Sequence, residues 1–106
     1  MVLYKEPKKI CERKIIQNRL TDFRELVEGN FECVRLGRRV VLFCNEEGKL
    51  KNLPLNVPLG EDPIHGPLIV CGEKEKDSHF GVAQSLPELS YIYYARIFNA
   101  TMFDLP

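Results

Sequence analysis

The sequence predicts a small α+β domain in which a mainly antiparallel sheet of about four to six strands packs with two helices. Two strongly apolar runs, at residues 40–44 and 67–71, are bounded by turn residues, which is typical of central strands. Two other segments, at about 21–29 and 86–98, carry apolar residues at steps of three and four, which indicates helices. The length of 106 residues suits a single domain with a modest core, so we expect residues 1–106 to form one unit.

The composition is that of a globular protein. Hydrophobic residues make up 44% and charged residues 28%, which argues against disorder. The formal net charge of zero gives no overall attraction to nucleic acid or to a membrane surface, so neither is an expected partner. No apolar stretch approaches the ~20 residues of a membrane span, and Lys5, Lys8 and Lys9 interrupt the start of a secretory leader. We therefore expect a cytoplasmic protein.

The cysteines show no metal or redox pattern. Their positions, 11, 33, 44 and 71, lack the short spacing of zinc knuckles and dithiol oxidoreductases. Cys33, Cys44 and Cys71 lie in apolar runs and are predicted to be free core thiols, while Cys11 lies among charges and is predicted to be exposed. A disulfide set is the less favoured alternative, and no metal or cofactor is expected.

The first quarter of the chain predicts two short strands and a helix. Residues 2–4 are typical of an edge strand, and residues 11–17 of a second short strand. Thr21 is a suitable N-cap for the first helix, and Gly29 suits the left-handed residue that follows a helix.

A hairpin and an acidic turn follow. Residues 30–36 alternate and are predicted to pair with residues 39–44 around a two-residue turn at Gly37 and Arg38. Residues 45–48, with the sequence NEEG, indicate the next turn. Residues 50–55 alternate up to Pro54 and are predicted to be extended.

The last part of the chain predicts a long loop, a short strand and the second helix. Residues 56–66 are rich in proline and glycine, which indicates the longest loop of the chain. Residues 79–83 are predicted to form a last short strand. Ser85 and Glu88 fit a capping box at the start of the second helix.

Three short motifs point to a family. They are CNEEGKL at residues 44–50, LPLN at residues 53–56 and IHGPLIVCG at residues 64–72. In this order and spacing they resemble a family of small proteins of unknown function from bacteria, phages and conjugative elements, over residues 20–95. Pro67 departs from the pattern, because the family usually has threonine there. The resemblance implies accessory genes of mobile elements, often beside anti-restriction functions, and it implies no activity.

Glu46 and Glu47 are the conspicuous candidates for acid–base or metal chemistry. Adjacent residues in a turn point apart, whereas a two-carboxylate mechanism needs both groups aimed at one point. Asp62 from the long loop is the candidate for the missing partner carboxylate. The sequence favours a shaped turn with both glutamates in water, and leaves a small hydrolase as the third alternative.

Four polar residues of the same region are candidate ligand-binding groups. Asn45, Asn52, Asn56 and His65 lie in or beside the turn and the long loop. An asparagine side chain either fastens a loop by bonding nearby backbone or binds the amide or base edge of a ligand. The fastening role is favoured, and binding of a small nucleotide-like molecule is the alternative.

The second helix carries three tyrosines that cannot all face inward. Tyr91, Tyr93 and Tyr94 lie about 100° apart per residue around the helix, so at least one ring must reach the surface. An exposed tyrosine beside Arg96 is typical of a protein-binding patch. We select Tyr91, Tyr94 and Arg96 as candidate partner-binding residues, and rings that cover the edge of the core are equally favoured.

Three functions compete, in this order. The first is a small non-enzymatic accessory protein of a phage or mobile element that binds a host protein, in a counter-defence role such as anti-restriction. The second is a binding protein or sponge for a small nucleotide-like ligand, with the pocket between the subunits of a homo-oligomer. The third is the hydrolase that uses Glu46, Glu47 and Asp62.

Overall fold

The computed structural model describes residues 1–17, 20–73 and 83–101, and it confirms the α+β fold with a mainly antiparallel sheet. The main sheet has the order β2 (Glu12–Lys14), β1 (Val2–Lys5), β7 (Leu68–Glu73), β4 (Val40–Asn45) and β3 (Phe31–Gly37). The short strand β8 (Ala83–Gln84) pairs with β7 beyond the end of β1, and every pairing between these strands is antiparallel. A second small sheet joins β5 (Leu55–Val57) to β6 (Ile64–His65).

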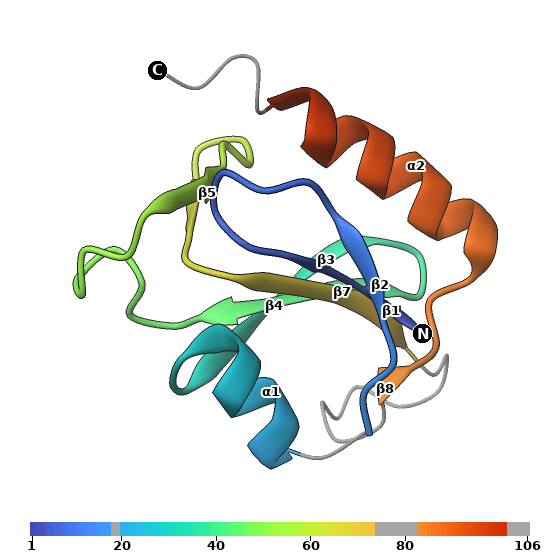
Figure 1. The fold of residues 1–106 in the computed structure, drawn as a ribbon, viewed down its shortest axis with the longest axis horizontal. Helices are drawn as coiled ribbons and strands as arrows, with labels where there is room; N and C mark the ends of the chain where they lie inside the picture. Colours follow the sequence, from blue (N-terminus) through green and yellow to red (C-terminus); the bar gives the residue numbers. More distant parts are fainter. Residues whose placement is uncertain (18–19, 74–82, 102–106) are drawn as a thin grey trace.

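The two helices cover opposite faces of the main sheet. Figure 1 shows α1 (Leu20–Val27) on one side of the strands and α2 (Glu88–Ala100) on the other. Alternate residues of β4 and β7 therefore enter different clusters: Leu42 and Val70 face α2, and Val41 and Ile69 face α1. Both strands are buried along almost their whole length, which explains why they are continuous apolar runs.

Aromatic rings attach α1 to the sheet. The ring of Phe23 is stacked on Phe43 of β4, with centroids 5.0 Å apart and an interplanar angle of 17°. Phe31 of β3 meets both rings edge-on. Offset and edge-on ring pairs are the favoured aromatic geometries, so this cluster fixes the position of the short helix.

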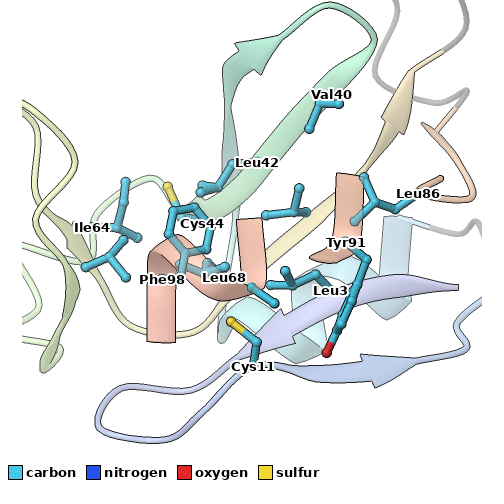
Figure 2. Close-up of a cluster of buried hydrophobic side chains, with 13 residues drawn as sticks. Leu3, Cys11, Val40, Leu42, Cys44, Ile64, Leu68, Leu86, Tyr91 and Phe98 are labelled. Carbon is cyan, nitrogen blue, oxygen red and sulfur yellow. The ribbon is translucent and has the colours of Figure 1, made fainter. Parts of the chain in front are cut away.

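Tyr91, Ala95 and Phe98 are the buried residues of α2. They form a cluster with side chains that include Leu3, Leu42, Leu68 and Leu86 (Figure 2). At the edge of this cluster the guanidinium of Arg13 lies over the Tyr91 ring, 4.1 Å from its centroid, and pairs with Glu88. Strand β2 is thereby connected to α2.

The prediction that residues 50–55 are extended is wrong for most of that segment. Residues 46–52 form consecutive turns, in which the Lys51 N–H donates to the Glu47 carbonyl at 2.9 Å. Asn52 has a φ of 56°, a left-handed conformation that asparagine tolerates. The alternation before β5 therefore marks turns and not a strand.

The predicted loop at residues 56–66 contains regular structure. Val57 ends β5 and Ile64 begins β6, and the two strands pair with a bulge between Leu55 and Val57. A strand of two or three residues is too short to give a periodic signal, so the proline and glycine content dominated the prediction.

The end of α1 and the hairpin turn are each shifted by one residue. Glu28 takes the left-handed conformation directly after α1, with a φ of 65°, and Gly29 follows with a φ of 151°. The turn between β3 and β4 lies at residues 38 and 39, and Arg39 has a φ of 59°. Gly37 instead pairs with Val40 at the end of the hairpin.

The predicted capping box does not form at α2. The helix begins at Glu88, with Pro87 at the N-cap position and no side-chain cap. The hydroxyl of Ser85 donates to the carbonyl of Met1 at 3.2 Å and accepts from the Met1 amino group at 3.0 Å. Ser85 thus fastens the start of the chain, because a nearby backbone group satisfies its hydroxyl outside the helix.

Cys11 is buried and not exposed as predicted. Its N–H donates to Asn99 Oδ1 at 2.7 Å, which draws this residue under α2. The following strand is limited to β2, which is shorter than the predicted strand at residues 11–17.

Residues 79–82 of the predicted last strand lie outside the described residues. Within the described part of the chain, neither helix has the length and apolarity needed to cross a membrane.

Candidate functional site

Asn45 connects three segments at the end of β4. Its Nδ2 donates to the carbonyls of Val27 and Glu28, each at 3.1 Å, and its Oδ1 accepts from the Glu47 N–H at 2.8 Å. The last carbonyls of a helix have no partners within the helix, so Asn45 satisfies the end of α1. The side chain is buried, and its Nδ2 and Oδ1 atoms both serve the fold.

Asn56 fastens the second sheet in the same way. Its Nδ2 donates to the carbonyls of Lys5 and Gly66, each at 2.8 Å, and its Oδ1 accepts from Lys5 Nζ at 2.6 Å. Lys5 is fully buried, and this burial lowers the pKa of its ammonium group. The amide therefore binds a cation of this chain, as the fastening role requires, and its ligand-binding role stays a prediction.

His65, Asn52 and the acidic residues have different surroundings. His65 Nδ1 lies 3.0 Å from the Leu53 carbonyl, while Asn52 is exposed in a turn. Glu46, Glu47 and Asp62 are all exposed. Within the described residues no three histidine, cysteine or acidic side chains gather closely enough to hold a metal ion. The catalytic role of the three carboxylates stays a prediction.

Two hollows of about 450 and 460 Å³ lie beside α1 and share Glu25 and Leu26. The larger is also lined by residues that include Tyr4, Glu6, Glu28 and Pro67. Asn45, Asn52, Asn56 and His65 line neither hollow. The structure therefore does not bring the predicted ligand-binding groups to these cavities.

The three tyrosines of α2 have three different environments. Tyr91 is buried below Arg13, and burial raises the pKa of its hydroxyl. Tyr94 is half-buried, with its ring against Phe98 and Tyr93. Tyr93, which the sequence analysis did not select, is 61% exposed. The predicted partner-binding roles of Tyr91 and Tyr94 stay predictions, and Tyr93 is the most exposed of the three rings.

An apolar stripe follows the solvent side of α2, and we call it the outer α2 face. Its apolar members and their exposed fractions are Leu89 (82%), Ile92 (41%), Tyr93 (61%) and Ile97 (42%), and Arg96 lies among them. At 100° per residue these positions span an arc of roughly 140°, opposite the buried side of the helix. A helix that is apolar on both sides is normally covered on both sides.

Arg96 is the charged member of this face. Among the described residues, no carboxylate pairs with its guanidinium. Tyrosine and arginine are the residue types that contribute most often to protein interfaces. The spacing of positions 89, 92, 93, 96 and 97 indicates a helix, but it does not tell whether this stripe or the opposite one is buried.

Residues 1–95 match the family described as "Domain of unknown function (DUF3846)", and the chain belongs to this family. The description of the family names no activity. No curated protein and no solved structure is similar enough to the chain to count as a match.

Proposed function

We propose that this member of the DUF3846 family is a non-enzymatic accessory protein of a phage or mobile element, and that it binds a host protein in the cytoplasm. The outer α2 face carries this proposal. Four large apolar side chains and one arginine occupy the solvent side of a helix whose opposite side already fills the core. Exposed apolar patches of this kind are typical of protein interaction sites.

The polar residues favour this function over binding of a small ligand. The amides of Asn45 and Asn56 hydrogen-bond to the protein itself, and His65 lies against a backbone carbonyl. Their geometry thus accounts for all three without a ligand. The phage or mobile-element setting, and a counter-defence role within it, are supported by the resemblance of the NEEG and LPLN motifs.

Affinity capture from host lysate with matched baits tests the proposal. The double variant Tyr93→Glu/Ile97→Glu places two charges on the outer α2 face, while Leu50→Glu places one on an apolar residue that is 83% exposed elsewhere. We expect a host protein that the wild type and Leu50→Glu both retain and the double variant loses. Retention of the same proteins by all three baits would contradict the proposal.

A further inference from the structure

We propose that a second copy of this chain covers the outer α2 face when no host protein is bound. The two copies form a two-fold dimer in which their α2 helices pack antiparallel. This inference rests on the proposed function, because it concerns the same face. Self-association would regulate host binding, because the same face cannot bind a second copy and a host protein at the same time.

The apolar residues have the spacing that such a helix pair needs. A two-fold axis level with Ile92 along the helix, with the seam centred between Leu89 and Tyr93 around it, sets the outer α2 faces of the two copies against each other. Leu89 and Tyr93 then fill the middle of the seam, with Ile92 on one flank and Ile97 on the other. Side chains at these three- and four-residue steps form the ridges that interlock when helices pack.

The charges of α2 are complementary to themselves in this arrangement. Glu88 begins the helix and Arg96 lies eight residues later, about 12 Å along the axis. The two positions lie within roughly 80° of each other around the helix, on one flank. Antiparallel packing about Ile92 therefore brings Arg96 of each copy to Glu88 of the other, and the contact occurs twice.

Two further observations favour a second copy as the occupant. Glu88 remains 56% exposed at its side chain although Arg13 already pairs with it, so its carboxylate accepts a second cation. The formal net charge of the chain is zero, so two copies approach without overall repulsion. A partner with uniform charge along its surface would meet one end of this face with the wrong sign.

Sedimentation equilibrium of the full chain, from about 1 µM to about 500 µM, tests the dimer, because a single helix pair is expected to associate in the micromolar range. Arg96→Glu places two acidic groups together at each end of the seam and should weaken the dimer about tenfold or more. Glu88→Arg should weaken it similarly, and the double variant Glu88→Arg/Arg96→Glu should restore dissociation to within about threefold of wild type.

Two controls separate this contact from other effects. Arg13→Gln removes the internal partner of Glu88 and should leave the dimer nearly unchanged, and Leu50→Gln should do the same. A wild-type chain that stays monomeric throughout, or a double variant no stronger than the single ones, would overturn the dimer. Neither result affects the host-capture experiment, which is performed at low bait concentration. If every variant still captures the host protein, the proposed function is overturned, whereas a measured dimer is unaffected.

Discussion

Lys5 and Asn56 form a hydrogen bond between two fully buried polar side chains. The lysine is fully buried, and its ammonium donates to the amide oxygen of Asn56 and to the carbonyl of Glu6, the latter at 3.4 Å. Asn56→Ala leaves the buried cation and two backbone carbonyls without this partner, so we expect a loss of about 2–4 kcal/mol in the free energy of unfolding. Urea unfolding measures it.

Asn52→Gly is the matched control, because glycine readily adopts the left-handed conformation of this exposed residue. We expect its urea midpoint to stay close to that of wild type. If Asn56→Ala unfolds at the same urea concentration as this control, Asn56 does not fasten the second sheet.

The three buried thiols and the half-buried thiol of Cys33 lead us to expect a loss of stability at alkaline pH. Burial raises the pKa of Cys44 and Cys71 to about 12, and that of Cys11 and Cys33 to about 11. Above pH 9.0 the unfolded thiols release protons that the folded state keeps, so stability falls as pH rises. The maximum slope is about 1.4 kcal/mol per pH unit for each thiol.

Lys5 acts in the opposite direction, because its folded pKa is lowered from 10.5 and the folded state loses that proton first. One lysine offsets only one of the four thiols. We expect the urea midpoint to be level up to about pH 8.5 and to fall from pH 9 to 12. Cys71→Ala should reduce the slope of this fall, whereas parallel curves for variant and wild type would show that Cys71 does not titrate in this way.

At the scale of elements, Gly48 allows the turn after β4 to lie against β6. A Cβ atom at this residue would be 2.5 Å from the backbone oxygen of His65, which cannot move away as a side chain could. We expect Gly48→Ala to destabilise the fold by about 2 kcal/mol or more, as judged by urea unfolding. At Gly60 an added Cβ meets open space, so Gly60→Ala should cost only the roughly 1 kcal/mol of its left-handed backbone. Equal losses would show that the turn is not held against β6.

Some elements were predictable from the sequence because their signals are local. β4 and β7 are apolar throughout, and α1 carries one apolar stripe, so pattern alone identified them. The turns at residues 46–52 and the contact of Ser85 with Met1 depend on segments that meet only in the fold. The fastening role of the asparagines was favoured from the residue type alone, but the partner of Asn56, Lys5, lies 51 residues away and leaves no local signal in the sequence.

The candidate site was predicted only in part for a similar reason. The second helix, its tyrosines and Arg96 were identified, but the selection of Tyr91 and Tyr94 over Tyr93 required knowledge of which side of α2 meets the sheet. Because the helix is apolar on both sides, its periodicity does not say which stripe is buried. The buried stripe is the one that packs on Leu3, Leu42 and Leu68, and these residues lie far from α2 in the sequence.

At the scale of the molecule, the three layers leave one helix with an uncovered side. α1 is short and covers one face of the sheet, while α2 covers the other and presents the outer α2 face to solvent (Figure 1). The polar residues near the acidic turn support the fold. We propose that a host protein binds the outer α2 face.

Site-specific photo-crosslinking in host cells tests this claim most directly. A photoreactive phenylalanine analogue at position 93 replaces an exposed ring with one of similar size, and the same analogue at position 50 is the control on a different exposed apolar residue. We predict a covalent adduct with a host protein from position 93 and not from position 50. A position-93 probe that reacts with no host protein, or with the same proteins as position 50, would contradict the claim.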